Sequence, residues 1–132
     1  MIYLLDTNTC IYFLNEASAS VVLNFQRLSP SKIRLPSLTV AELYYGAEKS
    51  KAKLKNAKVV EDFVSTFDIV PFDEKSCKVY AKIRASLEKA GTPIDPIDLL
   101  IGSISVANNF ILVTNNIREF KRVKGIKLEN WF

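Results

Sequence analysis

The sequence predicts an α/β sandwich around a parallel sheet of four or five short strands. Short apolar runs at residues 2–5, 33–36 and 110–114 have the length of buried strands and end in small or polar residues or in proline. The longer stretches between them carry apolar residues at helical spacing. Strands that alternate with helices in this way pair in parallel, and ligands bind beyond the carboxyl ends of such strands.

The first strand, residues 2–5, ends at Asp6 and should lead into a helix capped by Thr7 or Asn8. Residues 19–29 form the next predicted helix. Its apolar positions at helical spacing are Val21, Val22, Phe25 and Leu28.

Residues 33–36 form the second predicted strand, and Pro36 marks its end. Ser37 is a suitable N-cap for a helix over residues 38–51. One face of that helix should carry Leu38, Ala41, Glu42, Tyr45 and Ala52. A lysine-rich amphipathic stretch follows over residues 53–66.

Residues 67–72 read as a third strand, followed by Asp73 as the cap of a long helix that Gly91 stops. A further helix begins near Asp95 and Pro96, because proline suits the first turn of a helix. Residues 110–114 are the clearest buried strand, and the basic tail returns through residues 126–128 to Trp131.

The length of 132 residues fits one compact domain, so we expect a single domain over residues 1–132. No apolar run approaches the roughly 20 residues that span a bilayer, and the start lacks the features of a secretory signal. Cys10 and Cys77 form no motif. These features predict a cytoplasmic protein with no membrane association.

The chain contains no histidine, and its formal net charge is +4. The absence of histidine excludes Ser-His-Asp and Cys-His catalysis, paired-histidine ribonuclease chemistry and histidine-bound metal sites. The modest basic excess favours a polyanionic partner without requiring one. If the protein is an enzyme, its carboxylates carry the chemistry.

Two acidic residues of the first half of the chain are candidates for such chemistry. Asp6 follows the first strand directly, although an aspartate in this place is often only a helix cap. Glu42 lies among apolar neighbours of its helix, where a carboxylate is costly unless a cation or hydrogen bonds receive it.

Two further candidates lie in the second half. Asp98 falls in the first turn of its helix, where capping is the simpler explanation, but Asp95 is the better cap and leaves Asp98 free for a cleft. Glu119 follows the polar residues after the fourth strand, and a solvated surface glutamate is its alternative explanation. Carboxylates without histidine or thiolate form an oxygen-only ligand set, which favours Mg²⁺ or Mn²⁺ and a phosphodiester substrate.

The chain resembles the PIN-domain ribonucleases and, within them, the VapC toxins of bacterial toxin-antitoxin modules. The resemblance rests on six motifs spread over nearly the whole chain: Leu5–Asn8, Val40–Gly46, Pro93–Ile101, Leu112–Asn116, Glu119–Val123 and Glu129–Trp131. It implies a three-layer α/β/α sandwich.

The resemblance implies that Asp6, Glu42 and Asp98 are acidic ligands of a Mg²⁺ or Mn²⁺ site that Glu119 completes. Supporting polar residues would be Thr114, Asn116 and Asn8. Many PIN domains have an aspartate at the position of Asn116, and the toxin pattern has a glycine at the position of Asp95, which we expect only to cap its helix.

The resemblance also implies an endoribonuclease toxin that cuts RNA, such as a tRNA, inhibits translation, binds a small VapB-like antitoxin and forms a homodimer. Two basic runs could hold RNA phosphates: Lys49, Lys51, Lys53, Lys55 and Lys58, and Arg118, Lys121, Arg122, Lys124 and Lys127. Four aromatic residues, Tyr12, Phe13, Tyr44 and Tyr45, suit either the core or an apolar groove for an antitoxin segment, and we expect at least half of them in the core.

Three alternatives stay open. An aspartyl-phosphate enzyme of the haloacid-dehalogenase type would also place an aspartate after the first strand, but it needs a second one where this chain has Asn8. The second is a binding module of the same fold that has lost catalysis. Asn116, which stands where many PIN domains have an aspartate, is the only residue in its favour. A free-standing nuclease without an antitoxin is the third.

Overall fold

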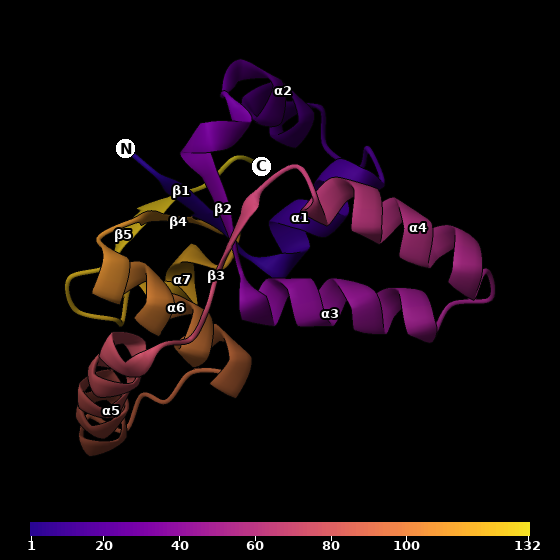
Figure 1. The fold of residues 1–132 in the computed structure, drawn as a ribbon. Helices are drawn as coiled ribbons and strands as arrows, with labels where there is room; N and C mark the ends of the chain where they lie inside the picture. The colour runs from indigo at the N-terminus through magenta and orange to yellow at the C-terminus, as the bar shows by residue number, and fades with distance from the viewer.

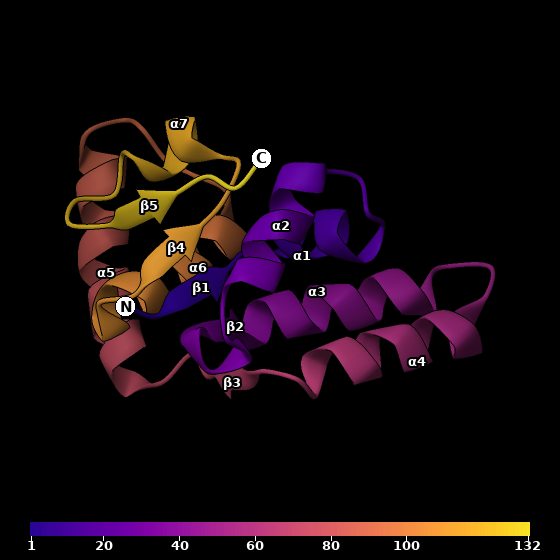
Figure 2. The same cartoon turned by 90° about the horizontal axis from the view of Figure 1, so that it is seen from above.

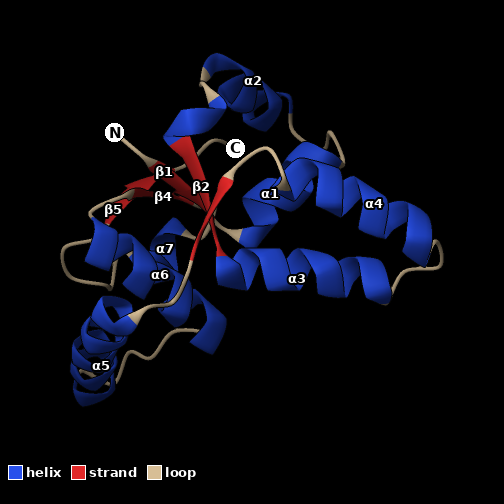
Figure 3. Ribbon diagram, viewed as in Figure 1, coloured by secondary structure: helices blue, strands red, loops and turns tan.

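The computed structural model describes residues 1–132, whose five strands form one sheet with helices on both sides (Figures 1 and 3). The strands are β1 (Tyr3–Leu5), β2 (Ile33–Pro36), β3 (Asp68–Val70), β4 (Ile111–Val113) and β5 (Lys127–Glu129). Their order is β3-β2-β1-β4-β5, and every neighbouring pair is parallel. The predicted parallel sheet is confirmed, with β2 as predicted and β1, β3 and β4 slightly shorter than the runs that indicated them.

Seven α-helices surround the sheet: α1 (Thr7–Leu14), α2 (Ala19–Arg27), α3 (Ser37–Glu48), α4 (Lys53–Val64), α5 (Glu74–Lys89), α6 (Pro96–Asn108) and α7 (Ile117–Phe120). Helices α3 and α4 run side by side and extend away from the sheet, while α5 packs along α6 on the opposite side of the molecule (Figures 1 and 2). None of the helices is long and apolar enough to cross a lipid bilayer.

Neighbouring residues of β1 divide the core between the two faces of the sheet. Leu5 belongs to the larger cluster, which includes residues of α1, α2, α3 and α4, whereas Leu4 packs with Ile101 and Ile104 of α6. Successive side chains of a strand point to opposite faces, which explains this division. Each of these fully buried side chains contributes about 1.5–3 kcal/mol to folding.

Aspartates cap three helices, and two of these caps match the sequence prediction. Asp73 accepts a hydrogen bond from the Ser76 N–H, and Asp95 accepts from the N–H groups of Ile97 and Asp98. The prediction for α1 is wrong: its cap is Asp6, which lies one residue earlier than Thr7.

The prediction for α3 is also wrong in two respects. The helix already includes Ser37, and Pro36 occupies the cap position without a side-chain hydrogen bond. Its buried residues are Thr39, Leu43 and Ala47, spaced four apart, whereas Ala41 and Tyr45 are exposed. Apolar residues occur on several sides of this helix, so the sequence alone does not identify the side that is buried.

The aromatic residues near α1 and α3 are less buried than expected. Only Phe13 packs against the core, stacked on Phe25 with ring centroids 4.1 Å apart. Tyr12, Tyr44 and Tyr45 are exposed, so the expectation that at least half of the four lie in the core is wrong. A buried tyrosine hydroxyl needs a polar partner, and exposure to solvent removes that requirement for these three residues.

Candidate metal centre

The carboxyl ends of β1 and β4 meet at the place where the chain changes its direction of travel across the sheet. From β1 the chain moves to β2 and then β3 on one side, and β4 and β5 are added on the other side of β1. Ligands of open parallel sheets bind at such a switch point. Asp6 directly follows β1, and Thr114 directly follows β4.

A cleft of about 320 Å³ lies beside Asp6 and receives residues from α1, α3 and the start of α6. Its lining consists of Asp6, Thr7, Asn8, Ile11, Glu42, Tyr45, Gly46, Lys49, Asp95, Ile97 and Asp98. The structure therefore brings together three of the four predicted acidic residues, Asp6, Glu42 and Asp98, together with Asn8.

Asp6 has a structural role in addition to its place in the cleft. Its side chain is only 6% exposed, and Oδ1 accepts a hydrogen bond of 2.9 Å from the Thr9 N–H. This bond caps α1 and holds the carboxylate in a fixed orientation. No protein donor binds Oδ2, which leaves that oxygen for a ligand.

Glu42 reaches the cleft from the second turn of α3. It is half-buried, and its Oε1 accepts a short hydrogen bond from the hydroxyl of Thr7. Thr7 belongs to the first turn of α1, so this bond connects the two helices across the cleft. A hydrogen bond satisfies the carboxylate that the sequence places among apolar neighbours.

Asp98 is the most perturbed acid of the cleft. Burial raises the pKa of this half-buried carboxyl group to about 6, and the negative charges of Asp95, Glu119 and Asp6 add to the increase. The amide of Asn116 partly offsets the effect by donating a hydrogen bond. Like charges crowded in this way favour a proton or a cation.

Glu119 does not line the cleft but is connected to it by hydrogen bonds. Its Oε2 accepts from the Asn116 side-chain amide over 2.9 Å, and its Oε1 accepts from the Asp95 N–H over 2.6 Å. The Asn116 amide, and then the Asp95 N–H, lower the pKa of Glu119 despite partial burial. Asn116 also binds Asp98 at 3.3 Å and so connects the two acids.

Thr114 holds the backbone of Asn116 in place. The residue is fully buried, and its hydroxyl oxygen accepts a hydrogen bond of 2.9 Å from the Asn116 N–H. It therefore fixes the start of the loop that carries Asn116 and Glu119. Asn8 differs from Thr114, because it lies exposed at the wall of the cleft.

The chemistry of these donors suits a hard divalent cation, because the acidic residues at the cleft offer only oxygen ligands. In the arrangement described, no three of the acidic side chains converge on one point closely enough to bind an ion together. Glu42 is held by Thr7, and Glu119 is held by Asn116 and the Asp95 N–H. Glu119 would have to turn from its donors to join Asp6 and Asp98 on one ion, whereas Oε2 of Glu42 accepts no hydrogen bond.

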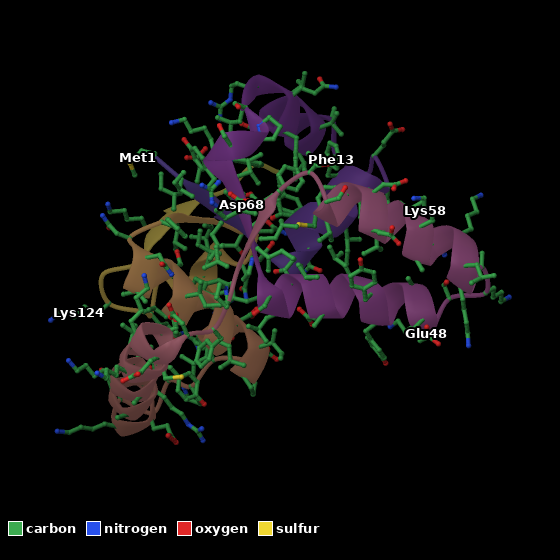
Figure 4. All side chains as sticks on the ribbon, viewed as in Figure 1. Met1, Phe13, Glu48, Lys58, Asp68 and Lys124 are labelled. Carbon is green, nitrogen blue, oxygen red and sulfur yellow. The ribbon has the colours of Figure 1, made fainter.

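The structure places three further residues in the cleft that the sequence does not assign to it: Tyr45, Lys49 and Asp95. Asp95 caps α6 as predicted, but its backbone also holds Glu119, which the sequence does not indicate. The two basic runs lie apart, as Figure 4 shows by Lys58 on α4 and Lys124 at the opposite side of the molecule. Lys49 alone among their members lines the cleft.

Comparison with known proteins places this chain in a known family. The family model of the PIN domain matches residues 3–126. Ribonuclease VapC2 of Rickettsia felis is 43% identical over 132 residues, which cover 99% of this chain and 98% of that protein. The tRNA(fMet)-specific endonuclease VapC of Salmonella typhimurium is 39% identical, over 98% of this chain and 97% of its own length.

Solved structures agree with these sequence matches. A chain of the crystal structure of VapBC2 from Rickettsia felis, bound to a DNA fragment from their promoter, has a TM-score of 0.92 at 42% identity and covers both chains completely. A chain of DNA-bound VapBC from Salmonella typhimurium has a TM-score of 0.94 at 36% identity, covering 100% of this chain and 99% of its own. The three-layer fold implied by the resemblance is thus confirmed, and the chain belongs to the PIN-domain family and, within it, to the VapC ribonucleases.

Proposed function

We propose that this protein is a metal-dependent endoribonuclease that cleaves RNA in the acidic cleft at the carboxyl ends of β1 and β4. The observation that carries the proposal is the meeting of Asp6, Glu42 and Asp98 in one cleft, from three segments far apart in the sequence. Ribonuclease and endonuclease activities named for VapC relatives of about 40% identity support it.

We assign the metal ligands to Asp6, Glu42 and Asp98, with Glu119 as the fourth acidic residue of the site. PIN-domain VapC nucleases generally depend on a divalent metal ion, and the oxygen-only donors favour Mg²⁺ or Mn²⁺. Such an ion would supply positive charge against a phosphodiester and lower the pKa of water.

The residues of the chain prepare the cleft for that chemistry. The Thr9 N–H orients Asp6, and the Thr7 hydroxyl orients Glu42. Burial and neighbouring carboxylates favour a proton on Asp98, so binding of a divalent cation there must displace that proton. The cleft is therefore expected to bind metal more weakly below about pH 6.

We further propose that the protein acts as a single-domain toxin of the cytoplasm, which inhibits translation and is held inactive by a small VapB-like antitoxin. The related solved structures are those of VapBC proteins, which supports such a partner. A tRNA substrate is favoured by the Salmonella typhimurium relative, whose name specifies tRNA(fMet). The homodimer implied by the resemblance stays a prediction.

The test uses the purified chain, total bacterial RNA and Mg²⁺ or Mn²⁺, with cleavage followed on a denaturing gel. We expect cleavage that EDTA abolishes and that Asp6→Asn and Asp98→Asn variants lack. Asp6→Asn is a suitable control because asparagine caps helices about as well as aspartate, so α1 should persist. Circular dichroism checks that each variant is folded.

Absence of cleavage by the folded wild-type protein with either metal would contradict the nuclease proposal and favour a binding module that has lost catalysis. Coexpression with the product of a neighbouring short reading frame tests the partner. A stable complex that suppresses cleavage would support the toxin role, whereas a cleaving protein that forms no complex with such a product would indicate a free-standing nuclease.

A further inference from the structure

Tyr45 and Lys49 line the acidic cleft, although no metal ligation requires either of them. They lie four residues apart at the carboxyl end of α3 and its cap, which places them on the same side of the helix. The Nζ atom of Lys49 lies 5.1 Å from the centroid of the Tyr45 ring. Lys49 is the only cationic residue that lines this cleft.

The structure assigns neither side chain a role in holding the fold together. Lys49 lies beside a cleft with four acidic residues, yet it forms no salt bridge with any of them. Tyr45 remains 65% exposed with the lysine ammonium over its ring. An exposed aromatic ring and an ammonium group without a salt bridge, next to a candidate catalytic site, are therefore available to a ligand.

We propose that Tyr45 and Lys49 form a nucleotide-binding subsite, in which the ring of Tyr45 stacks on an RNA base and the ammonium of Lys49 binds the adjoining phosphate. The inference rests on the proposed ribonuclease function and specifies how RNA is held beside the acidic residues. Every nucleobase has a face that stacks on an aromatic ring, and a lysine ammonium binds phosphate as a point charge.

The acidic residues of the cleft explain why RNA binding requires a positive side chain there. Asp6, Glu42, Asp95 and Asp98 repel a polyanion, and Lys49 supplies the one positive side chain that counteracts the repulsion at the wall of the cleft. The apolar side chains of Ile11 and Ile97 also line the cleft and can contact the edge of a base.

A base must leave its stack before it can pack against Tyr45, so the subsite selects unpaired nucleotides. Bases in an RNA duplex are stacked, and their faces are closed to side chains. Stacking tolerates all four bases, so the subsite contributes affinity and little sequence preference. We expect binding to a loop or a single strand and much weaker binding to a duplex of the same sequence.

The test measures binding of a short fluorescein-labelled single-stranded RNA by fluorescence anisotropy in an Asp98→Asn background, which prevents cleavage. Adding Tyr45→Ala is expected to weaken binding about tenfold, and Tyr45→Phe should restore it because the ring is kept. Adding Lys49→Ala should lower the slope of log affinity against log salt by about 0.7, the contribution of one phosphate contact in a single strand.

The chain provides matched controls. Tyr44→Ala removes an exposed ring next to Tyr45 that does not line the cleft, and Lys51→Ala removes a neighbouring charge outside it. Neither control should change the affinity or the salt slope by a comparable amount. In the cleaving protein, Tyr45→Ala should raise KM with little change in kcat, which a general loss of structure would not do.

The outcomes separate this inference from the nuclease proposal. If the wild-type protein cleaves RNA while the Tyr45 and Lys49 variants behave like the controls, the subsite is wrong and the nuclease stands. If no cleavage occurs but the same variants weaken binding selectively, the subsite stands and the nuclease is wrong. Failure of every protein to bind single-stranded RNA would overturn the subsite, and the cleavage assay alone would then decide the nuclease proposal.

Discussion

The side-chain amide of Asn116 donates a hydrogen bond of 3.3 Å to Oδ2 of Asp98. The same amide donates to Oε2 of Glu119, so one neutral group joins two carboxylates. An aspartate at this position, as in many PIN domains, would add a third negative charge instead. In the metal-free protein, the amide therefore reduces the repulsion between the carboxylates of Asp98 and Glu119.

The variant Asn116→Asp tests this effect. In EDTA we expect it to lower the free energy of unfolding by about 1–2 kcal/mol, because it replaces a donor by a carboxylate that repels Asp98 and Glu119. Mn²⁺ should stabilise this variant more than the wild type and so reduce the difference between their free energies of unfolding. Thermal unfolding with EDTA and with Mn²⁺ measures both, and Asn116→Ala, which removes the donors without adding charge, is the control. An equal response of all three proteins to Mn²⁺ would contradict the expectation.

Two substitutions of Asp6 should separate its structural role from its proposed role at the metal. Asp6→Asn keeps an acceptor for the Thr9 N–H and should cost little stability, whereas Asp6→Ala loses the cap of α1 and about 1 kcal/mol. Both should reduce cleavage by more than about a hundredfold, since even indirect partners of metal ligands affect activity up to that extent. Urea unfolding and initial cleavage rates measure the two effects. Full activity of Asp6→Asn would exclude a metal-binding role for this carboxylate.

The raised pKa of Asp98 predicts a pH-dependent stability in the absence of metal. The pKa of Asp98 is about 6 in the folded protein and 3.8 for an ordinary aspartate. Below about pH 4 the carboxyl group is protonated in both the folded and the unfolded state, and the fold is not destabilised by its charge. This stability is lost as the pH rises through 6, because the folded protein must then carry the buried negative charge. Replacement of Asp98 by Asn should therefore increase the free energy of unfolding at pH 8 by about 1–2 kcal/mol, after allowance for solvent screening of a half-buried group. Urea unfolding in EDTA at pH 5 and pH 8 tests this, and a gain that does not grow with pH would oppose it.

Thr114 should affect activity through Asn116. Thr114→Val removes the acceptor of the Asn116 N–H in a fully buried place and is expected to cost about 1–3 kcal/mol and to lower kcat, because the loop holding Asn116 and Glu119 is released. Thr114→Ser keeps the hydroxyl and should retain kcat at a smaller cost in stability. The comparison of kcat for the two variants is decisive, since equal values would mean that the hydroxyl does not position the loop.

The strands, and the place of Asp6 at the carboxyl end of β1, could be predicted from sequence because their signals are local. A short apolar run such as Ile111–Val113 reports burial directly, and Asp6 follows β1 without an intervening residue. Asp95 and Pro96 together mark the start of α6, as the structure confirms.

Other features depend on contacts between distant segments, which no local pattern contains. The hydrogen bonds of Asn116 to Asp98 and of Glu119 to the Asp95 backbone join residues separated by 18 and 24 positions. The exposure of Tyr45 and its place beside Lys49 follow from which side of α3 packs on the core, and that side is Thr39, Leu43 and Ala47. The apolar content of α3 alone did not identify it.

The central position of β1 has a consequence for the moment at which activity arises during synthesis. Strand β1 is synthesised well before β4, one of its two partners, because more than 100 residues separate Leu5 from Ile111. Because Asp6 follows β1 and Asp98 and Asn116 come from the late segments, the site cannot assemble on a nascent chain that lacks them. The ribosome that makes this protein is therefore not exposed to the finished cleft until the segments that carry Asp98 and Asn116 have been synthesised.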